Sequence, residues 1–222
     1  MITADRKPID EVLASLADAR RILLLGCHGC VTVCAAGGER EVAELASELR
    51  LADRLQGRQR DYQQVTIERQ CDREFFDTIH EQMQDSDLVL SLACGAGVQL
   101  AAEVALPVPV VPALNTTFLG VNTGPGSWDE RCLGCGDCLL EITGGICPIA
   151  RCSKSLLNGP CGGSANGKCE IDDSIDCAWQ LIHDRLKAQG RLEQIARVIP
   201  PRDWSSSRHG GPRRRVRPDL VR

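Results

Sequence analysis

The sequence predicts an α/β protein in which a small parallel-sheet domain is followed by a cysteine- and glycine-rich module with a C-terminal helix. Three observations support this prediction. Strand-like and helix-like segments alternate in the first half, which is typical of a parallel sheet with right-handed crossovers. Eight of the 13 cysteines lie between Cys132 and Cys177, with eight glycines among them. Residues 173–190 then carry a helical apolar stripe.

The first half contains four expected strands and three expected helices. Apolar runs predict strands at residues 22–26, 64–71, 87–94 and 107–114, the last with prolines at its margin. Helical periodicity predicts helices at residues 39–55, 72–83 and 97–105. This order predicts a flavodoxin- or Rossmann-like domain over residues 1–120, and residues 115–131 are expected to form a Gly- and Asn-rich connection.

The remaining chain is expected to contain a cysteine-rich module with its helix at 121–192 and a basic tail at 193–222. In the helix, Trp179, Ile182 and Leu186 share one face. From Pro200 onward, seven arginines and two aspartates give the tail a charge of +5 against −9 for the body. We expect this tail to be a disordered, solvated extension, although its charge could also contact nucleic acid or an acidic partner.

Length and composition exclude several classes of protein. The 222 residues are too few for a (β/α)₈ barrel of about 250 residues. No apolar run reaches the roughly 18 residues that span a bilayer, and the first ten residues lack the apolar core of a signal peptide, so we expect a cytoplasmic protein. Disulfides are rare in that compartment, and an odd cysteine count fits them poorly. Metal binding is therefore the better interpretation of the cysteines.

The second group of cysteines begins with a tight triple. Cys132, Cys135 and Cys138 form C-x2-C-x2-C, a spacing that can wrap one corner of a cuboidal iron–sulfur cluster. Cys147-Pro148 is similar to the Cys-Pro that closes a ferredoxin run, but eight residues separate it from the triple. Four cysteines follow at wider spacings: Cys152, Cys161, Cys169 and Cys177.

Eight thiolates are enough for two 4Fe-4S clusters, although the spacing does not assign each cysteine to a cluster. Zinc is the lesser alternative, because structural zinc more often takes its ligands as two separated pairs.

The first group of cysteines predicts a third site at a sheet edge. Cys27, Cys30 and Cys34 begin one residue after the first expected strand, and Cys71 and Cys94 each end an expected strand. Because parallel strands present their carboxyl ends at one edge, these thiols are expected to converge and to hold a third 4Fe-4S cluster.

The fourth ligand of that third site is open between two residues. Cys94 is the first choice, because the Gly-Ala-Gly that follows it frees the backbone to approach a cluster. Cys71 is second, because Asp72 adds negative charge beside an anionic cluster. Either residue alone could instead be a buried cysteine that acts as a small hydrophobe. His28 is expected to have no ligand role.

The other motifs in the sequence give little evidence of a function. Residues 162–169, GGSANGKC, differ by one residue from the phosphate-binding G-x4-G-K-[ST] motif. No apolar strand precedes them, and Cys169 stands where the motif has a hydroxyl. No Ser/His/Asp set or acid/base carboxylate pair is visible, so no catalytic residue is predicted.

The stretch RCLGCGDCLLEITGGICPIARCSKSLLNGPCGGSANGKCE resembles the C-terminal domain associated with methylenetetrahydrofolate reductase. Upstream, GCHGCVTVCAAGGEREV, TIERQCD and LSLACGAGVQ resemble the small MetV-type iron–sulfur subunit of that enzyme. The resemblance covers residues 20–190. It implies that the 13 cysteines are candidate cluster ligands and that the partner is a barrel subunit containing FMN or FAD, with further electron-transfer subunits possible. No flavin- or folate-binding residue carries over to this chain.

The residues support the same function in a coarser form. Metal sites without substrate chemistry predict an electron carrier that docks a partner and has no complete active site of its own. Two rival classes stay open. One is a zinc-stabilised interaction or nucleic-acid-binding module that uses the basic tail. The other is an iron–sulfur redox sensor.

Overall fold

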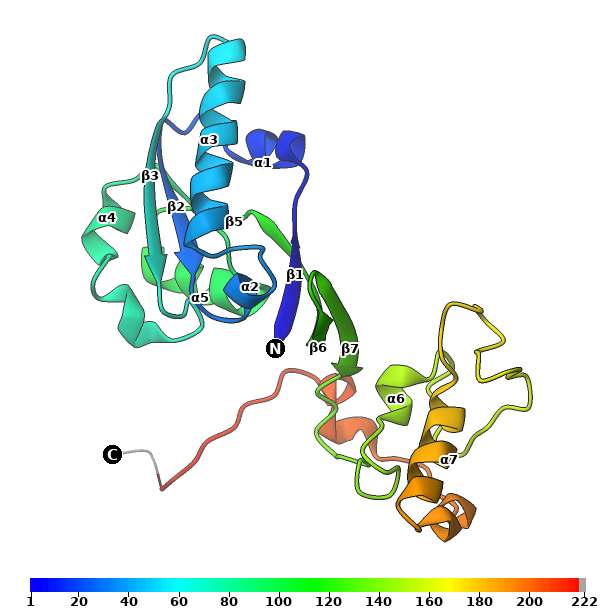
Figure 1. The fold of residues 1–222 in the computed structure, drawn as a ribbon. Helices are drawn as coiled ribbons and strands as arrows, with labels where there is room; N and C mark the ends of the chain where they lie inside the picture. The colour runs from blue at the N-terminus through cyan, green and yellow to red at the C-terminus, as the bar shows by residue number, and fades with distance from the viewer. Residues whose placement is uncertain (220–222) are drawn as a thin grey trace. The chain divides into compact units, whose positions relative to one another are not determined.

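The computed structural model describes residues 1–219, which form two compact units, Met1–Trp128 and a second unit that begins at Asp129 (Figure 1). The predicted α/β class is confirmed. Among residues 1–219, no helix combines the length and the apolar character needed to cross a membrane.

A four-stranded parallel sheet lies at the centre of the first unit, in the order β3-β2-β4-β5. Its strands are β2 (Arg21–Cys27), β3 (Asp61–Ile67), β4 (Leu88–Ser91) and β5 (Val110–Pro112). The register pairs Cys27 with Ile67 and Leu25 with Ser91. The carboxyl ends of β2, β3 and β4 therefore lie at one edge of the sheet.

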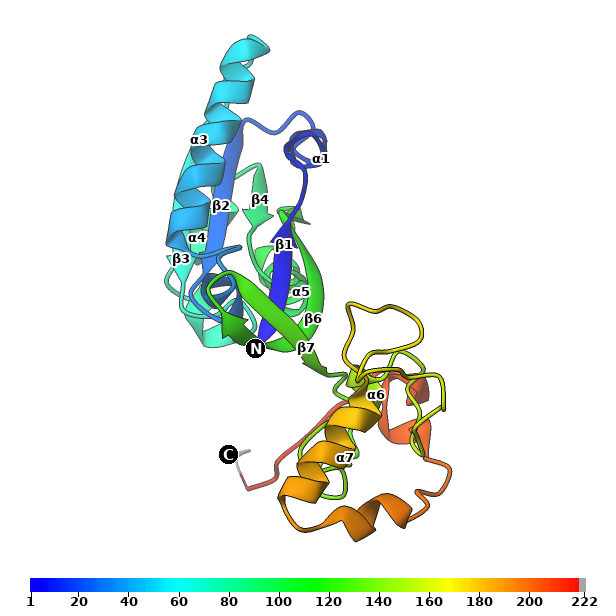
Figure 2. The ribbon, with the colours of Figure 1, turned by 45° about the vertical axis from the view of Figure 1, so that its right-hand side comes forward.

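Helices cover both faces of this sheet, as the alternation of apolar side chains along its strands requires. Leu24 packs on the face that carries α3 (Glu39–Leu55), whereas Leu23 and Leu25 pack on the face that carries α5 (Gly95–Ala105). Figure 2 shows α3 and α5 on opposite sides of the strands. The helix predicted at residues 39–55 is confirmed with those bounds.

The helix expected at residues 72–83 is instead two short pieces, η1 (Arg73–Phe76) and α4 (His80–Gln84). Phe76, Ile79 and Met83 are all buried against the sheet. The Ile79 N–H donates to the Phe76 carbonyl at 3.0 Å, and this i→i+3 turn brings both side chains to the core.

A second sheet, in the order β1-β6-β7, was not predicted. Its strands are β1 (Ile2–Arg6), β6 (Leu114–Gly124) and β7 (Ser127–Cys132), and β1 runs antiparallel to β6. The expected connection at residues 115–131 is therefore mostly strand. The hydroxyl groups of Thr3 and Thr117 lie 2.8 Å apart across this pairing. Two further helices of the first unit are α1 (Ile9–Ser15) and α2 (Cys30–Val33).

Loops make up most of the second unit (Figures 1 and 2). Its helices are α6 (Pro148–Arg151), α7 (Ala178–Ala188), η2 (Leu192–Ala196), η3 (Trp204–Ser206) and η4 (Arg208–Gly210). Its apolar core is small and consists of Ile146, Cys177, Trp179, Ile182 and Leu186. With so little apolar area to bury, the unit gains little stability from packing alone.

The helix expected from residue 173 begins five residues later, at Ala178. Two hydrogen bonds keep the preceding residues in a loop. The Ser174 N–H donates to the Asp172 carboxylate at 2.8 Å, and the Cys177 N–H donates to the Gly167 carbonyl at 2.8 Å.

Candidate metal centres

The first candidate centre lies at the carboxyl edge of the parallel sheet. Cys27 is the last residue of β2, and Cys30 begins α2. Cys71 follows β3 after a short loop, and Cys94 caps the N-terminus of α5 just beyond β4. Four cysteines from three strand ends therefore meet at the edge where open α/β folds bind their ligands.

The electrostatics of Cys71 place these four thiols near one another. The pKa of the Cys71 thiol is raised, first by partial burial and then by the charges of Cys94, Cys27 and Cys30. Charges affect one another in this way only over short distances, within about 10 Å at 0.1 M salt. We call these four cysteines, Cys27, Cys30, Cys71 and Cys94, the edge cluster.

Cys34, the third member of the predicted triple, packs in the same apolar core as Cys27. It is buried, and its Sγ lies 3.8 Å from the Ala4 carbonyl and 3.6 Å from the Val31 carbonyl. Burial is the main cause of its raised pKa. Its thiol therefore belongs to the apolar core beneath β1, although Cys30 still contributes to its electrostatics.

Gln70 holds the loops of the edge cluster together, and the sequence analysis missed it. Its side chain is completely buried, and Nε2 donates to the Leu25 carbonyl at 2.7 Å and to the Gly26 carbonyl at 3.0 Å. Its Oε1 accepts a hydrogen bond from the Ser91 hydroxyl at 2.6 Å. One amide therefore fixes the ends of β2 and β4 to the residue before Cys71. The sequence offered one signal for this role, which is a polar residue directly before Cys71.

The first turn of α5 approaches Gln70 closely. A Cβ atom on Gly97 would lie 2.8 Å from the Cβ of Gln70, so only glycine fits. The Gly95 N–H donates to the Thr116 hydroxyl at 2.8 Å. Cys94 lies at the N-cap of this helix. His28 is exposed, and its backbone N–H donates to the Ile67 carbonyl.

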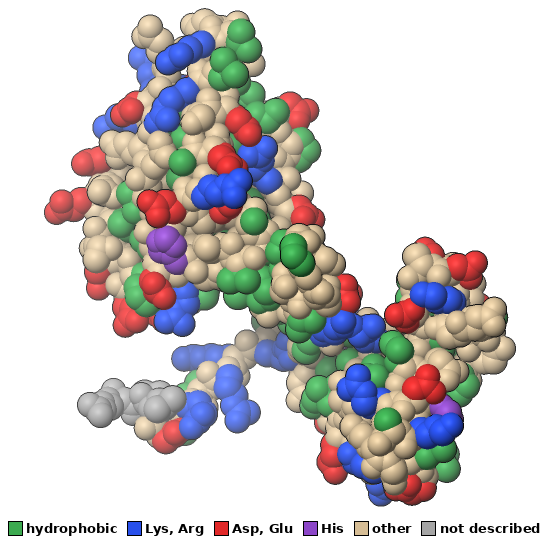
Figure 3. Space-filling view, viewed as in Figure 1, with side chains coloured by type: hydrophobic (Ala, Val, Ile, Leu, Met, Phe, Trp, Pro, Cys, Tyr) green, Lys and Arg blue, Asp and Glu red, His purple; other side chains and the backbone are tan. Residues whose placement is uncertain are grey.

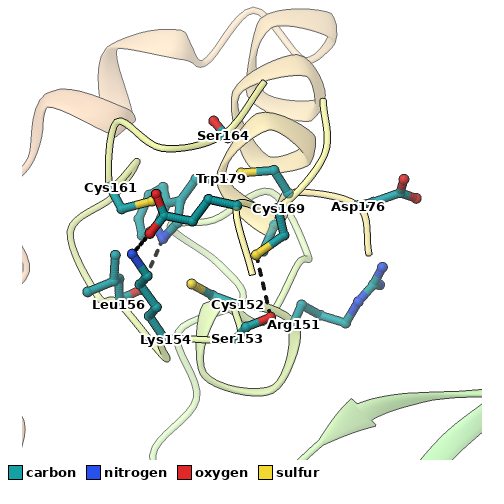
Figure 4. A pocket seen from close by; sticks show the side chains of 13 residues that line it. Arg151, Cys152, Ser153, Lys154, Leu156, Cys161, Ser164, Cys169, Asp176 and Trp179 are labelled. Carbon is teal, nitrogen blue, oxygen red and sulfur yellow. Dashed lines mark hydrogen bonds and ion pairs between the residues drawn. The ribbon is translucent and has the colours of Figure 1, made fainter. Parts of the chain in front are cut away.

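A second candidate centre is a cavity in the second unit. Four of the predicted ligands line it: Cys152, Cys161, Cys169 and Cys177. Figure 4 shows the side chains of Cys152, Cys161 and Cys169 directed toward the same space. The sequence spacing left the division of the eight cysteines open, and we call the four that line this cavity the cavity cluster.

The cavity favours negative charge at one of these thiols. The pKa of Cys169 is lowered, first by the Ile171 backbone N–H and then by the Ser153 hydroxyl, whose oxygen lies 3.5 Å from Sγ. Cys177 caps the N-terminus of α7.

The third candidate centre is the loop of Cys132, Cys135 and Cys138. The Gly134 N–H donates to the Sγ of Cys132 at 3.3 Å, as backbone groups do around iron–sulfur clusters. Gly136 has φ = +90°, and a Cβ atom there would lie 2.3 Å from the Ser206 carbonyl oxygen. The tight curl of this loop therefore depends on glycine.

Cys147 lies apart in sequence from this loop, at the N-cap of α6, and Cys152 ends the same helix. The Arg151 N–H donates to the Cys147 carbonyl at 3.0 Å. Helix α6 therefore separates Cys152, a member of the cavity cluster, from Cys147, which belongs to neither the cavity cluster nor the loop of Cys132, Cys135 and Cys138.

Among the described residues 1–219, no three His, Cys, Asp or Glu side chains lie close enough together to hold a single metal ion. A four-iron cluster holds its cysteines further apart than one ion does, because each thiolate binds a different iron atom.

Comparison with known proteins relates the second half of the chain to one family. Residues 111–205 match the family described as "Methylene-tetrahydrofolate reductase C terminal". The match includes all eight cysteines of the second unit and covers less than half of the chain. Neither the curated proteins nor the solved structures contain a match. The chain thus carries a segment related to methylenetetrahydrofolate reductase, as the sequence resemblance implied.

Proposed function

We propose that this chain is an iron–sulfur electron-transfer subunit that passes electrons to or from the flavin of a partner methylenetetrahydrofolate reductase catalytic subunit. The observation that carries this proposal is the grouping of cysteines in fours. The edge cluster and the cavity cluster each contain four thiols from separate segments. The related family of residues 111–205 supports the choice of enzyme.

Three sets of residues would hold three 4Fe-4S clusters. The edge cluster and the cavity cluster are two of the sets. The third set is the remaining four cysteines: Cys132, Cys135, Cys138 and Cys147. Each bound cluster would supply one-electron transfer at low potential.

The residues around each set fit an anionic group that is buried only in part. Helix N-termini stand behind Cys94 and Cys177, a backbone N–H points at Cys132, and a hydroxyl lies beside Cys169. These groups donate hydrogen bonds or partial positive charge to thiolates and are the usual means by which a protein stabilises a cluster.

The partner in this proposal is a cytoplasmic barrel subunit that binds FMN or FAD and the folate. This chain contributes the electron path and does not reduce methylenetetrahydrofolate alone. Purified free of its partner, it is expected to show no turnover of the folate, and measurable turnover would contradict this part of the proposal.

Anaerobic purification followed by metal and sulfide analysis tests the proposal. We expect about 12 iron atoms and as many sulfides per chain, with a brown absorption near 400 nm. The dithionite-reduced chain should then reduce the flavin of a methylenetetrahydrofolate reductase barrel subunit. A stopped-flow experiment would monitor this reduction as bleaching of the flavin absorbance.

Two other results would favour the rival classes. A colourless protein with stoichiometric zinc would identify a zinc-stabilised interaction or nucleic-acid-binding module. Clusters that form but exchange no electrons with the flavin, and that dissolve on exposure to oxygen, would identify a redox sensor.

A further inference from the structure

Arg202 is a buried cation beside the thiol of Cys135. Its side chain is only 3% exposed, and its Nη2 lies 3.2 Å from the Sγ of Cys135 and also contacts the Asp137 carbonyl. The guanidinium lies over the ring of Trp204, 5.2 Å from its centroid. Arginine is always charged in proteins, so burial of this group requires compensation from its surroundings.

The compensation within the chain is incomplete. Two nitrogen atoms of Arg202, Nε and Nη1, are buried and have no hydrogen-bond partner. The nearest carboxylate oxygen, from Asp137, lies 3.6 Å from Nη2, and the Asp137 side chain is 62% exposed. A buried donor without an acceptor costs about 1–3 kcal/mol, and more when it is charged. An acceptor or an anion is therefore missing beside Cys135.

Other contacts fix the same C-terminal segment on the loop of Cys132, Cys135 and Cys138. The Ser206 hydroxyl donates to the Cys135 carbonyl at 3.3 Å. Arg213 donates from Nη1 to the Gly134 carbonyl at 2.8 Å and to the Ser206 carbonyl at 3.1 Å. Ser206 and Arg213 thus attach the segment that follows Arg202 to this loop. The space-filling view shows basic side chains along the C-terminal segment (Figure 3).

We propose that Arg202 is a positioning residue for an iron–sulfur cluster on the loop of Cys132, Cys135 and Cys138, and that it raises the reduction potential of this cluster. The inference rests on the proposed function. The unpaired N–H groups of Arg202 would donate to the cluster and its thiolates. Basic residues 202–213 then belong to the metal centre, where a freely solvated tail was expected.

Charge gives the direction of the effect. One electron enters the cluster from an external one-electron donor, and no bond forms or breaks. The reduced cluster carries one more negative charge than the oxidised cluster. A buried cation stabilises the reduced form more strongly, because Coulomb interactions increase at low dielectric. The loss of this cation should therefore lower the potential.

The test uses the full chain purified anaerobically, with dithionite as reductant and EPR-monitored redox titration as readout. Three variants are compared with the unaltered chain. Arg202→Gln removes the charge, and Arg202→Lys keeps it without the planar set of donors. Arg213→Gln is the matched control, because it removes the same charge from the same segment but contacts carbonyl groups instead of a thiol.

We expect Arg202→Gln to change the reduction equilibrium of one cluster about tenfold toward the oxidised form, which corresponds to about 59 mV for one electron. Arg202→Lys should give a smaller shift, and Arg213→Gln the smallest. Loss of about four irons in Arg202→Gln alone would also support the proposal. Equal potentials in Arg202→Gln and Arg213→Gln, or equal iron loss in both, would overturn it. An unaltered chain without iron would instead refute the proposed function.

Discussion

The Ser91 hydroxyl donates to Oε1 of Gln70 at 2.6 Å, and this bond joins the end of β4 to the loop that carries Cys71. Neither residue contains sulfur. Together they fix the separation of two cysteine-bearing segments through buried hydrogen bonds, before any metal is bound. The geometry of the edge cluster is thus part of the fold of the first unit.

Gln70→Leu should destabilise the first unit. It removes the hydrogen bonds of Gln70 to the Leu25 and Gly26 carbonyls and to the Ser91 hydroxyl, and the Leu25 carbonyl keeps only the Leu92 N–H. We expect a loss of about 3 kcal/mol in the free energy of unfolding. Urea unfolding, monitored by circular dichroism, measures this loss in the free energy of unfolding. Gln99→Leu is the control, because Gln99 is exposed and bonds only the Gly95 carbonyl of its own helix. Equal stability of the two variants would contradict the role assigned to Gln70.

The grouping of the first five cysteines predicts a specific pattern of iron loss. Cys71→Ala and Cys94→Ala should each remove about four irons per chain, because each breaks the edge cluster. Cys34→Ala should leave the iron content unchanged, since its thiol lies in the core against the Ala4 carbonyl. Iron analysis of the three purified variants measures how many irons each one has lost. Four irons lost from Cys34→Ala and none from Cys71→Ala would restore the grouping expected from spacing.

Removal of metal should affect the two units differently. The second unit has a core of only a few side chains, whereas both faces of the parallel sheet in the first unit are covered. In the metal-free chain, we expect protease to cut first within residues 130–170 and to leave residues 20–115 intact. Mass spectrometry of the fragments over time identifies the cuts. Equal resistance of both regions would show that metal does not hold the second unit together.

Asp87 should titrate far below the usual range for an aspartate. The backbone N–H and side chain of Arg21 and the backbone N–H of Arg20 hold its pKa at about 2. A depressed pKa adds stability that is present above the unfolded pKa of about 3.9 and is lost as the pH falls through about 2. An NMR titration of the carboxyl carbon measures the midpoint.

Arg21→Gln separates the two contributions to this shift. The variant removes the side-chain donors but keeps both backbone donors. The pKa of Asp87 should therefore rise only in part and stay below the ordinary value. A complete return to the ordinary value would mean that the side chain alone causes the shift.

Local patterns predicted those elements that depend on local physics. The apolar stripe of α3 specified that helix fully, because one face packs on a sheet and the rest is solvated. The β1–β6 pairing joins the first residues to residues near 116, and no short window of sequence carries such a long-range contact. Gly120 and Gly124 also gave β6 the composition of a loop.

The same missing strand explains the position of Cys34. Regular spacing suggested that Cys27, Cys30 and Cys34 would share one site. Ala35 has φ = +52°, and the chain turns there so that the Cys34 thiol lies against Ala4 of β1. Since β1 was not predicted, the core that receives this thiol could not be predicted either. The strands predicted to end at Cys71 and Cys94 end earlier, at Ile67 and Ser91, so both cysteines lie in the loops beyond the carboxyl edge. Their position beyond that edge follows from parallel strands alone.

Under the proposed function, the bonds that Gln70 makes also affect how the chain would acquire its clusters. Loops fixed by protein hydrogen bonds remain in place when iron is scarce, so the first unit would stay folded and ready to accept a cluster from a cellular assembly scaffold. The second unit would fold only as its clusters are inserted. Under iron limitation, the two halves of one polypeptide would then differ in fate: one could be refilled, and the other would be exposed to degradation. Under the proposed function, the supply of iron would set the amount of this chain through its lifetime.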